Sequence, residues 1–405
     1  MKRVFVEVFP ASYGDCMLLR IEEPGAKAKN ILIDCGLAKT YKKFLKPRLK
    51  ELKKMGEEID LLIITHVDAD HITGAINLLK ENGSNQYSKI IKINEIWHNS
   101  FKNLYRDIQD ESLNKVDLSI LNNIRVETQH LDEDEELEAQ DISVNQGSHF
   151  ASLILKGGYS WNSSFGNQSI FIKDFNPITI MDDIKVTLLS PTYDALEKLK
   201  NYWEKELRSK GYDKLIQNHS IFEDIFEGIL LEENESTGEE AEDIASAKFN
   251  IDKLSNERFF PDESVTNGSS IVILLEIGQK KLLFMGDTHS DVLESTIKHL
   301  PPKVLKNLDL VKISHHGSKY NNGLSLYNLL SSKKYLITTD GSQHGHPHLE
   351  TLARIIKSNE MTKKSLVFNY PLEKIAPILD KTLMEEHGYE VVINEKEQVL
   401  IIEID

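Results

Sequence analysis

Five short, mainly aliphatic runs each end abruptly in a small or polar residue. They span residues 31–33, 61–64, 282–285, 310–313 and 335–337. Runs this short, rich in Ile, Leu and Val and without alternation, are typical of strands buried on both faces of a sheet. Helical patterns lie between them, at 41–55, 73–81, 290–299, 322–332 and 349–358. Strands that alternate with helices of this length predict an α/β layer architecture.

Nearly all the unusual polar residues of the sequence follow directly after these apolar runs. Asp34 follows the first run, His66 the second, Asp287 the third and His315 the fourth. In open α/β sheets, ligands bind at the carboxyl ends of the strands. The pattern therefore predicts that these residues meet at one shared site.

The middle and the end of the chain have different patterns. Residues 101–140 and 193–232 are helical and polar, and 169–190 contain strand signals. Residues 232–247 have no aromatic residue and a heavy negative charge, which is typical of a flexible insert. We expect one domain over 1–405, with helical or acidic insertions at about 101–141 and 193–263. The segment 373–405 is predicted to add a helix followed by two short strands.

The negative charge is concentrated in two segments. The formal net charge is −16, yet residues 131–141 hold seven acidic and no basic residues, and 221–263 hold fourteen acidic and three basic ones. The rest of the chain is close to neutral, so the charge does not exclude a polyanionic substrate. A basic segment at 40–54 is interpreted as the solvated face of a helix in preference to a contact with a phosphate backbone.

The cysteine count and the hydropathy favour a cytoplasmic protein. Cys16 and Cys35 are the only cysteines in 405 residues, which is typical of a reducing compartment without a disulfide framework. The first ten residues resemble a strand more than a secretory signal, since Glu7 interrupts their apolar run. No stretch approaches the roughly 18 to 20 uninterrupted apolar residues of a membrane span, so we expect no membrane partner.

The sharpest chemical signal is Thr65-His66-Val67-Asp68-Ala69-Asp70-His71, followed by Gly74. Four candidate ligands lie within six residues, directly after a predicted buried strand. Imidazoles and carboxylates packed this closely in one loop can converge on a metal ion. A charged turn with two solvated histidines is the alternative, and the apolar strand and the small residues around the motif disfavour it.

The pattern His-x-Asp-x-Asp-His-x-x-Gly resembles the signature loop of the metallo-β-lactamase fold hydrolases, in the variant with Asp at the second position. That variant is typical of the hydrolase domain of competence-type DNA-uptake proteins and of phosphodiesterase relatives. Further motifs follow in the order of the family: Tyr13-Gly14-Asp15, Leu32-Ile33-Asp34-Cys35-Gly36, Asn267-Gly268-Ser269-Ser270, Phe284-Met285-Gly286-Asp287-Thr288, Ser314-His315-His316-Gly317-Ser318 and Gly345-His346-Pro347. The resemblance spans residues 4 to about 358, interrupted by the acidic inserts.

The resemblance implies a four-layer αββα sandwich and a centre with one or two divalent ions, zinc or manganese. One site is implied at Asp70, His71, Asp287 and His316. His66 and Asp68 are implied to form the second, with Asp287 bridging. Asn267 stands near the place where members with two complete sites have a histidine, and Asp68 replaces the commoner histidine. The second site is therefore rich in oxygen ligands, which suit manganese better than nitrogen and sulfur ligands do.

Several residues have expected roles around these ligands. Asp34 is expected to hold the ligand loop by hydrogen bonds, and Asp15 either does the same or is an ordinary turn residue. Asp287 could alternatively cap a helix that begins at Ser290. His149 could supply a further imidazole, although a loop histidine is the preferred interpretation.

The late motifs supply the expected substrate contacts. Neighbours on an extended segment point in opposite directions, so His316 is assigned to the metal and His315 to the substrate phosphate or leaving group. Backbone N–H groups around Ser318 can face an anion. His346 is a candidate substrate contact or a loop histidine near a helix start, and Asn267 is a further candidate substrate contact.

The resemblance implies a metal-dependent hydrolase, either a phosphodiesterase or a nuclease. In the implied mechanism a metal-bound hydroxide, held by Asp70 and Asp287, attacks phosphorus, and His315 stabilises the leaving oxygen. Its partner is a phosphodiester, with nucleic acid as one candidate. Two alternatives remain open. One is a small substrate such as a cyclic nucleotide or a phosphocholine ester, which lacks the steep salt dependence of polyanion binding. The other is a catalytically weak binding or regulatory module of a multi-protein system, with anti-phage defence as one hypothesis.

Overall fold

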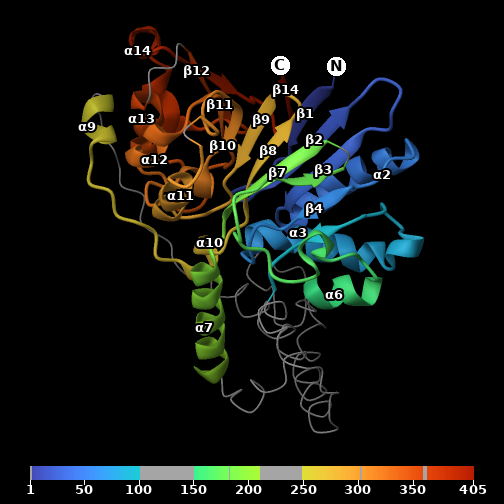
Figure 1. Ribbon diagram of the computed structural model, residues 1–405. Helices are drawn as coiled ribbons and strands as arrows, with labels where there is room; N and C mark the ends of the chain where they lie inside the picture. Colours follow the sequence, from blue (N-terminus) through green and yellow to red (C-terminus); the bar gives the residue numbers. More distant parts are fainter. Residues whose placement is uncertain (1, 101–149, 182, 210–248, 302, 359–362) are drawn as a thin grey trace, which may run out of the picture.

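Two β-sheets lie face to face in the centre of the molecule, and helices cover the outer side of each (Figure 1). The computed structural model describes residues 2–100, 150–181, 183–209, 249–301, 303–358 and 363–405. The predicted insertion at 101–141 and the candidate ligand His149 lie outside the described residues, as does 210–248 of the second insertion. No helix among the described residues is long and apolar enough to cross a membrane.

The first sheet has six strands. Their order is β14 (Leu400–Ile404), β1 (Arg3–Val8), β2 (Cys16–Glu22), β3 (Lys29–Cys35), β4 (Leu61–Ile63) and β5 (Ile96–Trp97). β3, β4 and β5 are parallel, and the others are antiparallel to their neighbours. The elements that follow or flank these strands are α1 (Ala38–Thr40), the π-helix Tyr41–Leu45, α2 (Lys46–Lys54), α3 (Ala69–Asn82), the 3₁₀ turn Asn85–Tyr87 and α6 (Phe150–Gly157). Cys16 and Cys35, opposite one another on β2 and β3, are buried free thiols.

The second sheet has eight strands. Their order is β13 (Tyr389–Ile393), β12 (Lys364–Phe368), β11 (Ser332–Ile337), β10 (Leu308–Lys312), β9 (Lys280–Phe284), β8 (Val272–Ile277), β7 (Ile184–Ser190) and β6 (Ile178–Ile180). β9 to β13 are parallel. The associated helices are α7 (Tyr193–Ser209), α9 (Ile251–Ser255), α10 (Val265–Gly268), α11 (Ser290–Ile297), α12 (Leu324–Leu329), α13 (Leu349–Lys357) and α14 (Lys381–His387). Three 3₁₀ segments complete the described elements, at Ser163–Phe165, Ser314–Gly317 and Glu373–Leu379.

Successive residues of the central strands point into two different hydrophobic cores. Because both faces of these strands are buried, their sequences are apolar throughout and do not alternate. On β11, Leu336 points into the core between the two sheets, whereas Tyr335 and Ile337 point into the core under the outer helices. On β3, Ile31 and Ile33 face the other sheet, and Leu32 faces α3 and its neighbours. Both faces of each sheet are therefore buried, and the predicted four-layer αββα architecture is confirmed.

The predicted elements agree with the structure except at some boundaries. The helix expected over 322–332 is shorter, since α12 ends at Leu329 and β11 begins at Ser332. Ile251 of α9, inside the second predicted insertion, is buried against the helices of the second sheet. The last two strands join different sheets: β13 pairs with β12, and β14 pairs with β1.

The motif glycine Gly74 lets helix α3 approach the end of β3. Its N–H donates to the carbonyl of Gly36 at 2.7 Å. A Cβ atom placed on Gly74 would lie 2.1 Å from the carbonyl oxygen of Cys35, far inside van der Waals contact. The close approach brings the first turn of α3, which holds Asp70 and His71, against the residues that follow β3.

Gly74→Ala should therefore destabilise the protein, because the backbone of β3 or of α3 has to move to make room for the methyl group. Overpacking of this kind typically costs about 1–3 kcal/mol. Urea unfolding at equilibrium measures the loss. Asn77→Ala, on a partly exposed position of the same helix, is the matched control and should change the stability by less than about 0.5 kcal/mol. Equal stability of the Gly74 and Asn77 variants would contradict the steric argument.

Candidate metal centre

The signature loop connects β4 to α3 and carries four candidate ligands. His66 and Asp68 lie in the loop after β4, while Asp70 and His71 lie in the first turn of α3. Asp287 belongs to the second sheet's side, three residues after the end of β9, and His316 lies in the 3₁₀ segment after β10. The carboxyl ends of strands from both sheets thus supply one cluster, as the sequence pattern predicted.

Four separations among the donor atoms of Asp70, His71, Asp287 and His316 match those of a tetrahedral site. From His71 Nε2, the Asp287 Oδ2 atom is 3.4 Å away and the Asp70 Oδ2 atom 3.6 Å. From His316 Nε2, both carboxylate oxygens are 3.5 Å away. Donors bound at about 2.0–2.2 Å from one tetrahedral ion lie about 3.3–3.6 Å from one another. The spacing therefore fits a single divalent ion.

The imidazoles of His66, His71 and His316 present a buried nitrogen that has no hydrogen-bond partner. In each ring that nitrogen is Nε2. The Nδ1 atom of each is engaged: His71 donates to Asp34 at 2.9 Å, and His316 to the carbonyl of Thr338 at 2.7 Å. Because these acceptors require a proton on Nδ1, Nε2 is the nitrogen that can offer a lone pair to a metal ion. Metal ligation by three such nitrogens around Asp287 would explain why these buried atoms have no hydrogen-bond partner.

Asp34 is the acceptor that orders the ligand loop. It is fully buried at the end of β3 and accepts the Thr65 N–H and hydroxyl, each at 2.8 Å, as well as His71 Nδ1–H. Since the Thr65 hydroxyl donates its proton to Asp34, its oxygen accepts Nδ1–H of His66 at 3.0 Å. One carboxylate therefore sets the ring orientation of two candidate ligands, as expected of a residue behind the metal ligands.

Asp15 lies behind the cluster. Donor atoms of Asp15, His71, Asp287 and His316 all lie within 4.8 Å of one another. However, Asp15 is fully buried, forms an ion pair with the buried Lys312 and accepts the hydroxyl of Thr338 at 2.6 Å. It does not line the cavity, whereas Asp70 does. We therefore assign the fourth donor to Asp70 and a supporting position to Asp15.

A second, smaller group of donors lies beside the first. His66 Nε2 is 3.5 Å from Asp68 Oδ2 and 3.9 Å from Asp287 Oδ2. Asp287 thus lies close to donors of both groups, as the expected bridging role requires. The amide oxygen of Asn267 is buried without a hydrogen-bond partner, while its Nδ2 donates to Asp262 at 2.8 Å. This second group is poorer in nitrogen donors than the first.

The buried carboxylates of the cluster shift the pKa values of its side chains so that positive charge is favoured there. Burial by itself would raise the pKa of Asp70, but the His71 and His316 imidazoles outweigh it and lower the pKa to about 2. Burial would lower the pKa of His316, but Asp287 and Asp15 raise it to about 9. Protons on the imidazoles supply the positive charge in the protein without metal, and a divalent ion would replace them.

The expectation of an extended segment at His315 and His316 is wrong. Their φ angles are +43° and +51°, so both are in the left-handed region. Because the chain curls there, the two side chains do not alternate, and both approach Asp287: His315 Nε2 lies 3.8 Å and His316 Nε2 3.5 Å from the same Oδ2 atom. Asp287 is also not a helix cap, since the N-cap of α11 is His289.

Two residues that the sequence did not indicate orient His315. Asn321 Oδ1 accepts Nδ1–H of His315 at 2.9 Å, and Asn321 Nδ2 donates to Asp262 at 2.9 Å. Asp262 Oδ2 also lies 3.8 Å from His315 Nδ1. Asp262 could not be singled out because it is one of fourteen acids in a segment interpreted as an insertion, and Asn321 follows no predicted strand.

The cluster opens into a cavity of about 700 Å³, within the range of small-ligand sites. The cavity is lined by all four predicted substrate-contact residues, His315, Ser318, His346 and Asn267. Lys39 and His344 also line it and were not predicted as contacts. Burial and the neighbouring histidines lower the pKa of His346 well below its usual value. His346 therefore faces the cavity as a neutral imidazole at neutral pH.

The sequence comparisons agree with this class of site. Residues 10–155 match the model of the Metallo-beta-lactamase superfamily. The chain is also 29% identical over 93 residues to ComE operon protein 3 of Bacillus subtilis strain 168. That match covers 23% of this chain and 12% of the relative, so the chain spans about an eighth of the length of this curated relative. The resemblance to metallo-β-lactamase fold proteins of the competence type is thereby confirmed.

Solved structures give a weaker likeness. Zn²⁺-bound PqqB from Methylobacterium extorquens is 10% identical with a TM-score of 0.34, covering 95% of this chain and 86% of that chain. A long form RNase Z from yeast is 11% identical with a TM-score of 0.35, covering 98% of this chain and 44% of that chain. Scores this low establish neither a shared fold nor a shared activity.

Removing the carboxylate of Asp34 should weaken metal binding although Asp34 is not a ligand. In Asp34→Asn, an amide has to face the three donors that now point at the carboxylate, so His71 and His66 lose their fixed orientation. Loss of such an interaction typically costs about 10–100-fold in metal affinity. Competition with a chromogenic chelator measures the affinity for Zn²⁺ and Mn²⁺.

Asp309→Asn is the matched control. Asp309 is also buried and accepts a backbone N–H, that of Lys281 at 2.9 Å, but it lies near the start of β10, away from the cluster. The control should keep the metal affinity of the unsubstituted protein. Equal affinities for all three proteins would contradict the orienting role of Asp34.

Proposed function

We propose that this protein hydrolyses phosphodiester bonds at a centre of one or two divalent ions, zinc or manganese. The observation that carries the proposal is the convergence of three unpartnered imidazole nitrogens, from His66, His71 and His316, on the carboxylate of Asp287. Metal-dependent hydrolysis is the chemistry of the superfamily that residues 10–155 match. The two free cysteines are consistent with a cytoplasmic location.

A phosphodiester is the preferred substrate because hydrogen-bond donors line the same cavity as the candidate ligands. Lys39, His315, Ser318 and His346 line the same cavity as the carboxylates of Asp70 and Asp287. A phosphodiester has one negative charge and several acceptor oxygens, which fit a cation and neutral or charged imidazoles. The Asp-containing signature loop and the His-His-Gly-Ser segment resemble phosphodiesterase and nuclease members of the fold. Nucleic acid is one such substrate.

Bound divalent ions would lower the pKa of a water molecule and polarise a phosphoryl oxygen. The side chains then have distinct tasks. Asp70 and Asp287 accept hydrogen bonds from the attacking water and orient it. Asp34, Thr65 and the carbonyl of Thr338 keep the histidine rings from turning, so the ligand set is formed before the substrate arrives.

His315 is the residue that we propose protonates the leaving oxygen. Its Nδ1–H is held by Asn321, so Nε2 is the atom that faces the cluster. The carboxylates of Asp262 and Asp287 each lie 3.8 Å from a ring nitrogen of His315. After Nε2–H passes its proton to the leaving oxygen, the neutral ring keeps its hydrogen bond to Asn321, and no rearrangement is needed.

Asp287→Ala should abolish metal-dependent hydrolysis of p-nitrophenyl phosphodiesters and leave the protein folded. Asp287 contacts both groups of donors, so its loss removes a ligand from each. We expect turnover to fall to the background rate and the bound metal to fall below the content of the unsubstituted protein, while circular dichroism stays unchanged. Asp291→Ala, an exposed aspartate in the first turn of α11, should keep full activity. Full activity of the Asp287 variant would refute the proposal.

His315→Ala should slow the cleavage of esters with poor leaving groups more than those with good ones. A general acid contributes typically about 10²–10⁴-fold where the leaving oxygen needs a proton. An alkyl ester should therefore lose at least about a hundredfold in kcat, and a p-nitrophenyl ester much less. Comparing kcat across aryl and alkyl leaving groups measures this. An equal loss for all esters would show that His315 only binds the phosphate.

A further inference from the structure

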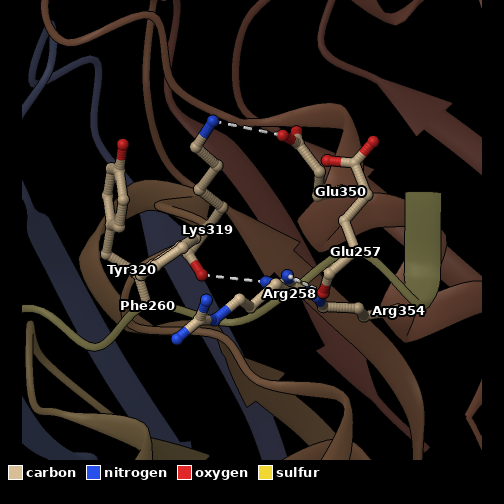
Figure 2. A pocket seen from close by; sticks show the side chains of 7 residues that line it. All are labelled: Glu257, Arg258, Phe260, Lys319, Tyr320, Glu350 and Arg354. Atoms are coloured by element: carbon tan, nitrogen blue, oxygen red, sulfur yellow. Dashed lines mark hydrogen bonds and ion pairs between the residues drawn. The ribbon is translucent and has the colours of Figure 1, made fainter.

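A second cavity, of about 420 Å³, is shown in Figure 2. It shares Tyr320 with the cavity of the candidate metal centre, called the metal pocket below. Its lining residues are Glu257, Arg258, Phe260, Lys319, Tyr320, Glu350 and Arg354. Tyr320 lines both cavities, three residues beyond the end of the segment that holds His315 and His316. The size of the second cavity is within the range of sites that take a small organic group.

The walls of this second cavity are fixed by a buried arginine. Arg354 on α13 is 2% exposed, and its guanidinium donates to the carbonyls of Lys319 at 2.8 Å, Asn322 at 2.9 Å and Glu257 at 3.3 Å. These carbonyls belong to the two chain segments, 257–260 and 319–322, that supply most of the lining residues. Because one rigid group is bonded to both segments, the cavity exists before any ligand binds.

The lining combines aromatic surface with charges of both signs. Phe260 is 53% exposed, and the guanidinium of Arg258 lies 4.8 Å from the centre of its ring. In the described part of the chain, Arg258 has no carboxylate partner, and no ring contact joins Phe260 to Tyr320. In Figure 2 the two aromatic residues lie on one side and the carboxylates of Glu257 and Glu350 on the other; Glu350 accepts from Lys319 at 3.2 Å.

This combination suits a flat ring with polar edges better than a simple anion. Aromatic and guanidinium planes stack on nucleobases irrespective of the base, and carboxylates accept from exocyclic amino and ring N–H groups. A site for phosphate alone would instead gather cations without carboxylates, whereas here two glutamates face the cavity.

The two cavities are joined by the segment that follows Phe260. The N–H of Asp262 donates to the carbonyl of Tyr320 at 3.0 Å, and Asp262 itself lines the metal pocket. Phe260 and Asp262 are thus two residues apart in the chain, and Phe260 lines the second cavity while Asp262 lines the metal pocket. The second cavity therefore adjoins the metal pocket at Tyr320 and along residues 260–262.

We propose that the second cavity is a subsite for the nucleoside attached to the scissile phosphodiester, with its base stacked on Phe260 and Arg258. The proposal rests on the proposed phosphodiesterase function and narrows its substrate to nucleotide esters. It makes Phe260 and Arg258 specificity residues, which contact the flanking nucleoside and not the reacting phosphorus.

The test compares two kinds of probe, with and without a nucleoside, that share the scissile bond and the leaving group. The probes are thymidine p-nitrophenyl phosphate, as both the 5′ and the 3′ ester, and methyl p-nitrophenyl phosphate. The measured quantity is the ratio of their kcat/KM values for the metal-loaded full chain. We expect a preference for one thymidine ester, which falls about tenfold in Phe260→Ala and in Arg258→Gln, mainly through KM.

Tyr87→Ala and Lys54→Gln are the matched controls, because they remove an exposed aromatic ring and an exposed cation elsewhere. Both should keep the preference. An unchanged ratio in the Phe260 and Arg258 variants, or no preference for either thymidine ester, would overturn the subsite. An equal loss on both probes would assign the cavity to structural support and overturn it as well.

Failure of the proposed function gives a different result. If the metal-loaded protein cleaves neither probe, the phosphodiesterase proposal is wrong, and the subsite is tested by binding instead. Fluorescence anisotropy with a labelled thymidine dinucleotide should then show saturable binding that weakens about tenfold in Phe260→Ala. Absence of saturable binding, or equal binding by the variant, would refute the subsite on its own.

Discussion

The buried carboxylate of Asp34 is the interaction on which the metal centre depends. It accepts three hydrogen bonds, two from Thr65 and one from His71, and through the Thr65 hydroxyl it also fixes His66. Leaving even one of these buried donors unpaired costs about 1–3 kcal/mol. The end of β3, the loop after β4 and the first turn of α3 therefore have a single compatible arrangement.

Charge balance is the second constraint. Asp15, Asp34 and Asp287 are buried within one small volume, and Lys312 is the buried amine that faces two of them. Unpaired carboxylates at such depth are unfavourable by several kcal/mol each. The imidazoles around Asp287 offset the cost of burying its carboxylate, either by binding protons or by binding a divalent ion together with it. The residues that stabilise the buried carboxylate are therefore the same ones that create the affinity for metal.

The residues that position His315 also shape the neighbouring cavity. The segment from His315 to Asn321 contains His315, which lines the metal pocket, and Tyr320, which lines both cavities. The side chain of Asp262 accepts a hydrogen bond from Asn321 in this segment, and the N–H of Asp262 donates to the carbonyl of Tyr320. Orientation of His315 and the shape of the second cavity consequently depend on one short stretch of chain after α9.

The hydrophobic pattern by itself determined the α/β class, the buried strands and the ligand loop, and the family resemblance implied the order of the four layers. Apolar runs without alternation require burial on both faces, and polar residues at strand ends must meet at one edge. Only the tertiary structure decided which residues support them. It curled the chain into a left-handed turn at His315. It also joined segments tens of residues apart, through the hydrogen bond from Asn321 to Asp262 and those from Arg354. Such contacts have no local pattern, because a side chain's partner is set by how the layers pack and not by its neighbours in sequence.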